Sequence, residues 1–148
     1  YEIGVRLVGS EMCIRDRWTS FAGQVLGRKV PLKDLLCDKA VVVGIGELYS
    51  DEILFHAGLR YDRPSNTLST QEVRRLHGAL ISVVNGAIKY RGTNLEERPF
   101  VDVYGEPGTY GDHLAVYGRA GALSERNRSA IQRIKYKGRW TYFCETQV

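Results

Sequence analysis

Two glycines separated by one residue lead into an amphipathic run in the segment GIGELYSDEILF, which starts at Gly44. Such a turn can bind phosphate, because glycine permits close backbone approach and the first N–H groups of a helix lack intrahelical acceptors. A dinucleotide fingerprint would require a preceding strand and a third glycine, where this chain has Tyr49. We therefore interpret Gly44 and Gly46 as a tight turn between two helices, with the second helix beginning near Glu47.

Basic residues are concentrated in the last quarter of the chain. Residues 113–148 contain seven lysines and arginines and two acidic residues, a net charge of +5, whereas the remainder has 14 basic and 15 acidic residues. This asymmetry favours a polyanionic partner. The alternative is a basic surface that is only solvated.

Length and composition limit the class of protein. The 148 residues are enough for one ordinary domain or two small ones, and the 43% hydrophobic content supports a packed core. No run of 18 apolar residues occurs, so we predict no membrane association. Three widely spaced cysteines, Cys13, Cys37 and Cys144, argue against a disulfide framework and for a reducing, cytoplasmic location.

Apolar spacing predicts the elements that must position the turn. A helix after Pro31 places Leu32, Leu35, Leu36 and Ala40 on one face, and a second helix spans residues 48–56. Ser69 and Glu72 form a capping-box signature before a third helix that ends near Gly92. The third helix is expected to bury Val73, Leu76, Leu80, Val83, Val84 and Ile88.

The tail predicts a β-hairpin. Two β-rich runs, 131–136 and 140–144, flank the turn signal Lys137-Gly138, whereas residues 93–113 are glycine-rich and irregular. The predicted fold is therefore mainly α with a small C-terminal β-hairpin.

The first 17 residues differ from the rest of the chain. The string LVGSEMCIRDR within them is similar to translated sequencing-adapter sequence. We therefore predict that residues 1–17 are non-native, that fold reasoning starts at Trp18, and that the natural protein extends further towards its N-terminus. The alternative is a genuine edge strand.

Three motifs together resemble one family. The segment from Pro31 to Ser69, PLKDLLCDKAVVVGIGELYSDEILFHAGLRYDRPSNTLS, is similar to the helix–two-turn–helix region of the formamidopyrimidine-DNA glycosylase/endonuclease VIII (Fpg/Nei) family. VYGR, ending at Arg119, and GRWTYFC, beginning at Gly138, resemble its C-terminal zinc-finger region. The resemblance implies a helix–two-turn–helix domain over 18–112 and a degenerate zinc-finger-like hairpin over 113–148.

The resemblance also implies a set of DNA contacts. Lys33 and Arg139 would bind phosphates, Arg139 beside the lesion, and a guanidinium suits bridging phosphate oxygens. The family usually has asparagine where this chain has Glu47, and an ionised carboxylate cannot donate to phosphate and repels it. The predicted DNA-binding set is Lys33, Gly44, Gly46, Glu47, Tyr49, Arg119 and Arg139.

Zinc, which the family implies, does not suit this sequence. A structural zinc site requires four Cys or His ligands in two close pairs, and the corresponding positions are Ser124, Asn127, Cys144 and Gln147. We expect no bound metal or other cofactor. The hairpin is expected to persist through packing of Ile131, Ile134, Trp140, Tyr142 and Phe143, and the histidines, His56, His77 and His113, lack ligand spacing.

Family catalysis uses an N-terminal proline amine and an adjacent glutamate. This chain starts Tyr1-Glu2, so we assign no catalytic residue and expect the chain alone to be inactive. The implied parent is a base-excision-repair DNA glycosylase with AP lyase activity, monomeric, bound to damaged double-stranded DNA and associated with the bacterial nucleoid. A non-catalytic nucleic-acid-binding relative is the alternative. A nucleotide-binding oxidoreductase fragment is a third hypothesis, which predicts cofactor binding instead of salt-dependent DNA affinity.

Overall fold

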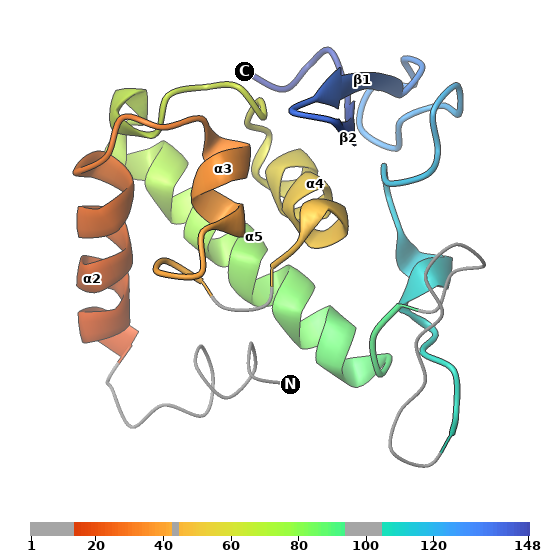
Figure 1. The fold of residues 1–148 in the computed structure, drawn as a ribbon, viewed down its shortest axis with the longest axis horizontal. Helices are drawn as coiled ribbons and strands as arrows, with labels where there is room; N and C mark the ends of the chain where they lie inside the picture. Colours follow the sequence, from red (N-terminus) through yellow and green to blue (C-terminus); the bar gives the residue numbers. More distant parts are fainter. Residues whose placement is uncertain (1–13, 43–44, 94–104) are drawn as a thin grey trace.

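The computed structural model describes residues 14–42, 45–93 and 105–148, with side chains from Trp18 onward. Four α-helices are followed by a two-stranded sheet in this part of the chain (Figure 1). The helices are α2 (Ile14–Leu26), α3 (Leu32–Cys37), α4 (Glu47–Ala57) and α5 (Thr70–Lys89), and the strands are β1 (Gln132–Tyr136) and β2 (Arg139–Phe143). Short 3₁₀ turns cover Ser65–Thr67 and Tyr110–His113. The predicted mainly α fold with a C-terminal hairpin is confirmed.

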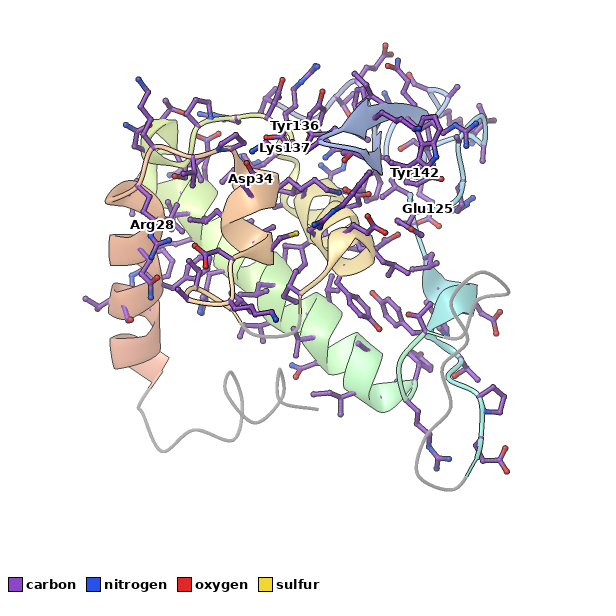
Figure 2. All side chains as sticks on the ribbon, in the orientation of Figure 1. Arg28, Asp34, Glu125, Tyr136, Lys137 and Tyr142 are labelled. Atoms are coloured by element: carbon purple, nitrogen blue, oxygen red, sulfur yellow. The ribbon has the colours of Figure 1, made fainter. Side chains whose placement is uncertain are left out.

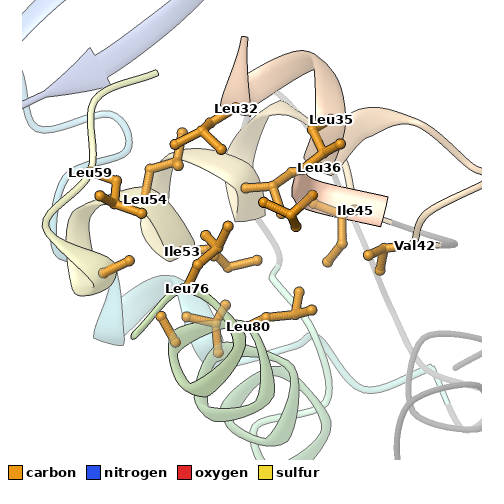
Figure 3. Close-up of a cluster of buried hydrophobic side chains, with 14 of the residues drawn as sticks. Leu32, Leu35, Leu36, Val42, Ile45, Ile53, Leu54, Leu59, Leu76 and Leu80 are labelled. Atoms are coloured by element: carbon orange, nitrogen blue, oxygen red, sulfur yellow. The ribbon is translucent and has the colours of Figure 1, made fainter. Parts of the chain in front are cut away.

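Helix α4 is the centre of the molecule. Eight of its eleven residues are buried, and it contacts α3, α5 and β2. Figure 1 shows α5 crossing behind α3 and α4, with the hairpin beyond α4. Leucine and isoleucine side chains from α3, α4 and α5 form the main core between these helices (Figure 3). Burial of these side chains provides the main favourable free energy of folding.

The ends of α4 and α5 follow from local sequence. Ser69 accepts a hydrogen bond from the Glu72 backbone N–H, and Glu72 accepts one in return from the Ser69 N–H, which confirms the capping box. Gly58 adopts the left-handed conformation, with φ of 73°, and terminates α4. Helix α4 therefore lies within one residue of each predicted end.

Two local predictions were wrong. Helix α3 ends at Cys37, so Ala40 lies in an exposed turn outside it. The side chain of Ile88, near the end of α5, is 45% exposed and not part of the core. The predicted non-native origin of residues 1–17 stays a prediction: α2 begins at Ile14, and residues 1–13 lie outside the described residues.

The hairpin has a two-residue turn. Lys137 and Gly138 both have positive φ, 51° and 81°, as a type I′ turn requires. Tyr136 pairs with Arg139 and Lys135 with Trp140, so these two pairs lie on opposite faces. Strand β2 begins one residue earlier than predicted, because Arg139 itself is paired.

A second, smaller core joins the tail to α4. It contains Phe55 from α4 and, from the tail, Ala115, Val116, Ile131, Tyr142 and Cys144. The packing predicted for Ile131, Tyr142 and Phe143 is confirmed, whereas Ile134 and Trp140 are 43% and 40% exposed. Within the described ranges the sheet consists of this antiparallel hairpin. None of the described helices has the length and apolar character needed to cross a membrane.

Candidate nucleic-acid interface

A cavity of about 290 Å³ lies between α3 and the tip of the hairpin. Arg139 lines it from β2, and its side chain is exposed. The Arg139 side chain is in no hydrogen bond or ion pair found among the described residues, so its five N–H donors remain available. The other lining residues are Lys33, Asp34, Cys37, Asp38, Tyr136 and Lys137.

Asp34 of α3 holds the hairpin turn against the helix (Figure 2). Its carboxylate accepts a 3.1 Å hydrogen bond from the Tyr136 hydroxyl and forms an ion pair with the Lys137 ammonium. Hydrogen bonding to Asp34 raises the pKa of Lys137. Desolvation, followed by the Asp34 charge, raises the pKa of Tyr136. Because Arg139 is the strand partner of Tyr136, this contact also fixes Arg139 beside α3.

Lys33, which the family resemblance predicted as a phosphate contact, is buried. Its side chain is 4% exposed, and its Nζ donates to Asp51 Oδ1 at 2.6 Å. Asp51 Oδ2 accepts the Tyr142 N–H at 3.1 Å, so this pair ties α3, α4 and β2 together. Desolvation raises the pKa of Asp51 to about 6, and Lys33 only partly offsets that effect. This arrangement gives Lys33 a structural role, and its predicted phosphate contact stays a prediction.

The turn before α4 is partly described. Gly44 lies outside the described residues, and Gly46 is the N-cap of α4 with φ of −103°. This φ is accessible to any residue, so the backbone conformation does not require glycine there. A Cβ at Gly46 would meet no atom within 4 Å, so the surface is open to close approach. Glu47 lies in the first turn of α4, where its charge favours the helix dipole but opposes a phosphate.

Two other predicted contact residues are engaged within the protein. The Tyr49 hydroxyl hydrogen-bonds to Thr93 Oγ1 at 3.0 Å, which ties α4 to the segment after α5. Arg119 Nη1 donates to the carbonyl oxygens of Leu114 and Ala115 at 3.3 and 3.1 Å, and lies 3.7 Å from Glu125 Oε1. The structure thus brings Arg139 and the buried Lys33 to one cavity, and places Tyr49 and Arg119 in other contacts.

Glu52 is the buried anchor of the tail. Its fully buried carboxylate accepts the N–H groups of Ala115, Val116 and Tyr117 at 2.9 to 3.1 Å. Sequence reasoning missed both Glu52 and Asp51, because acidic residues on a helix are ordinarily solvated. The available signal was that both fall within an otherwise apolar stretch of α4.

Hydrogen bonds connect positions at which the family resemblance implied zinc ligands. The Cys144 thiol donates to Asn127 Oδ1 at 3.2 Å, and the Cys144 N–H donates to Gln147 Oε1 at 2.6 Å. Gln147 Nε2 donates to the Leu59 carbonyl at 2.7 Å, and Ser124 is buried beside them. One thiol, one hydroxyl and two amides do not fit structural zinc. The described residues contain no cluster of three His, Cys, Asp or Glu side chains suited to a metal.

Comparison with known proteins identifies the class to which this fold belongs. Residues 11–98 match the family described as the formamidopyrimidine-DNA glycosylase H2TH domain. The chain therefore belongs to the formamidopyrimidine-DNA glycosylase family, as the sequence motifs predicted.

Individual relatives agree with this assignment. The chain is 41% identical over 116 residues to formamidopyrimidine-DNA glycosylase of Moorella thermoacetica, and the aligned segment covers 78% of this chain and 42% of the relative. It is 35% identical over 142 residues to the Lactiplantibacillus plantarum protein, covering 95% and 51%. The chain thus spans about half the length of the curated relatives that it matches.

Solved structures show the same fold. MutM (Fpg) of Thermus thermophilus superimposes with a TM-score of 0.82 at 35% identity, covering 87% of this chain and 48% of that one. Lactococcus lactis Fpg in complex with DNA containing an abasic site gives a TM-score of 0.77 at 29% identity, covering 86% and 45%. The second relative was therefore solved with damaged DNA bound.

Proposed function

We propose that this chain is the DNA-binding part of a base-excision-repair DNA glycosylase with AP lyase activity, and that it binds damaged double-stranded DNA through the phosphate backbone. The observation that carries the proposal is Arg139. Its side chain is exposed, forms no hydrogen bond or ion pair with the described residues, and is held at the edge of the cavity between α3 and the hairpin. The fold around it is shared with an Fpg solved on abasic-site DNA.

The proposed binding surface has two parts. Arg139 supplies a forked, permanently charged donor set for phosphate oxygens. The exposed Gly46 and the first turn of α4 provide an open approach to a helix N-terminus. Asp34 and the buried Lys33–Asp51 pair position these parts, and they need no contact with DNA themselves.

No catalytic residue is proposed within residues 1–148. The glycosylase and lyase chemistry belongs to the parent protein, and the chain alone is proposed to bind without cutting. No step is assigned to zinc, because the residues at its family position do not suit it. We further propose that the chain acts as a monomer in the bacterial cytoplasm, where chromosomal DNA lies.

A non-catalytic DNA-binding protein of the same family is the second candidate. It is favoured by Glu47, which opposes a phosphate at the start of α4. It is also favoured because three of the four positions that correspond to the family's zinc ligands hold Ser124, Asn127 and Gln147, none of which is a Cys or His. The two candidates differ in the protein that surrounds this segment, since only an enzyme requires a proline amine and glutamate at its mature N-terminus.

Fluorescence anisotropy of a labelled duplex tests DNA binding. The 148-residue chain is titrated with a duplex carrying an abasic-site analogue and with an intact duplex, at several salt concentrations. We expect tighter binding to the abasic duplex and an affinity that falls steeply with salt. Arg139→Ala should weaken binding about tenfold, and the salt slope should fall by about 0.9, the change expected for one lost phosphate contact.

Lys29→Ala is the matched control, because Lys29 is an exposed cation in the link between α2 and α3. It removes the same charge away from the cavity. Equal losses for Arg139→Ala and Lys29→Ala would show that only net charge matters and would refute the assigned role of Arg139. Absence of low-salt binding would refute DNA binding by this chain.

A further inference from the structure

The hairpin has a second charged surface on the face opposite Arg139. Arg133, Lys135 and Trp140 share this face, because Lys135 pairs directly with Trp140 and Arg133 lies two residues earlier on β1. The guanidinium carbon of Arg133 lies 4.2 Å from the centre of the Trp140 ring, and Lys135 Nζ lies 5.4 Å from it. We call these three residues the tryptophan platform.

The platform is accessible and cationic. The Trp140 side chain is 40% exposed, and Arg133 and Lys135 are also exposed. No acidic residue occurs in the hairpin sequence, residues 132–143. Asp34, the acid that contacts the hairpin turn, is engaged by Tyr136 and Lys137. The platform therefore presents two cations around an aromatic ring, without a carboxylate in either strand.

Exposing a large indole to solvent costs free energy, and packing within the protein does not explain why Trp140 is exposed. Tyr142, on the same face, is buried against Tyr117 at a ring distance of 5.0 Å, whereas Trp140 extends beyond that contact. A ring flanked by cations matches the surfaces that bind unpaired nucleotides, in which bases stack on aromatic rings and cations follow the phosphates. Bases also stack on guanidinium planes, so Arg133 extends the stacking surface.

We propose that the tryptophan platform binds single-stranded DNA, by stacking an unpaired base on Trp140 and Arg133 while Lys135 contacts the adjacent phosphate. An unpaired strand is favoured over duplex because paired bases are covered on both faces by their neighbours, so a surface indole cannot stack on them. The proposal goes beyond the proposed function, since it adds a site for an unpaired strand on the face of the hairpin opposite Arg139, and it can hold whether or not Arg139 binds duplex.

The stacking step is tested by tryptophan fluorescence. The chain contains two tryptophans, Trp18 and Trp140, so the Trp18→Phe variant leaves Trp140 as the sole indole. Addition of an oligothymidine of about twelve nucleotides, within the range of known single-strand site sizes, should quench this fluorescence in a saturable manner. Absence of quenching while the oligonucleotide binds would overturn the proposal.

Affinity is measured by anisotropy of the labelled oligothymidine. Trp140→Ala should weaken binding about tenfold, the loss expected for one stacked base. Ile134→Ala is the matched control, because Ile134 is equally exposed, at 43%, on the opposite face of the same hairpin. Equal effects of the two substitutions would overturn the proposal.

A second variant guards against misfolding of Trp140→Ala. Arg133→Gln combined with Lys135→Gln keeps the indole, and should weaken oligothymidine binding and reduce the salt slope by about 0.7, because Lys135 is the cation assigned to a phosphate of the single strand. Unchanged affinity in this variant would overturn the role of the two cations.

The two proposals fail in different ways. Abasic-duplex binding that is weakened in Arg139→Ala, with oligothymidine binding unchanged, supports two separate surfaces. Oligothymidine binding without any duplex binding would refute the proposed function and leave the platform standing. Duplex binding without oligothymidine binding would refute the platform alone.

Discussion

The buried carboxylate of Glu52 gives the sharpest prediction about stability. It accepts four hydrogen bonds from three successive N–H groups, those of Ala115, Val116 and Tyr117. Glu52→Gln keeps the size of the side chain but removes the charge and replaces one acceptor oxygen by a donor. The Ala115 N–H, which contacts both oxygens, then faces an NH₂ group in at least one of its contacts.

The magnitude follows from the nature of these bonds. Hydrogen bonds to a charged group contribute about 1.5–3 kcal/mol each, and a buried donor left without an acceptor costs about 1–3 kcal/mol. Glu52→Gln weakens all of the bonds and breaks at least one, so we expect a loss of about 2–4 kcal/mol in the free energy of unfolding. That is a large part of the roughly 5–15 kcal/mol typical of a domain.

Denaturant unfolding and amide hydrogen exchange measure the effect. The midpoint should fall, and amides 115–117 should lose protection more than those of α5, because the change acts on the segment that Glu52 anchors. Glu125→Gln makes the same chemical change at a side chain that is 69% exposed, and should alter stability by less than about 0.5 kcal/mol. Retained protection at 115–117 in Glu52→Gln would refute the reasoning.

Three further predictions concern charge and metal. First, desolvation raises the pKa of Asp51 from 3.8 to about 6. The stability that protonated Asp51 contributes is therefore fully present below pH 3.8 and is lost as the pH rises through 6. Carboxyl NMR of the folded chain should show a titration midpoint of Asp51 near 6, and a midpoint near 3.8 would contradict this prediction. Second, Glu47→Asn should tighten binding to abasic duplex several-fold at low salt by removing a repulsive charge, whereas unchanged anisotropy titrations would show that phosphate does not approach Glu47. Third, the purified chain should contain far less than one zinc per molecule by elemental analysis, and EDTA should leave its Tm unchanged; a Tm lowered by EDTA would show that Cys144 and its neighbours bind metal after all.

The local elements were largely predictable. The capping box at Ser69, the glycine stop at Gly58 and the Lys137-Gly138 turn each depend on a few neighbouring residues, so sequence specifies them directly. The errors occurred where longer-range contacts decide. Ile88 fits the apolar period of α5, but the turn at Tyr110–His113 packs beside Gly86 and Tyr90 at that end of the helix, and Ile88 remains 45% exposed.

The roles of charged side chains were less predictable. Lys33 has the same residue type and helical setting as a solvated lysine, yet Asp51, 18 residues later, draws it into the core. Asp34 contacts the hairpin more than 100 residues further along the chain, at Tyr136 and Lys137. Neither partner could be named from local pattern, because the Lys33–Asp51 contact exists only once α4 packs on α3, and the Asp34 contacts only once the hairpin packs on α3.

The sequence by itself determined the family, the order of helices and hairpin, and the unsuitability of the former zinc positions for metal, because these depend on residue types and short spacings. Tertiary structure alone decided which basic side chains remain exposed and could contact a phosphate. It buries Lys33 on Asp51, engages Arg119 with backbone carbonyls, and leaves Arg139 exposed beside the cavity. The physical reason is that a charge is neutralised by whichever opposite charge or dipole the fold brings within about 4 Å, and chain distance does not constrain that pairing.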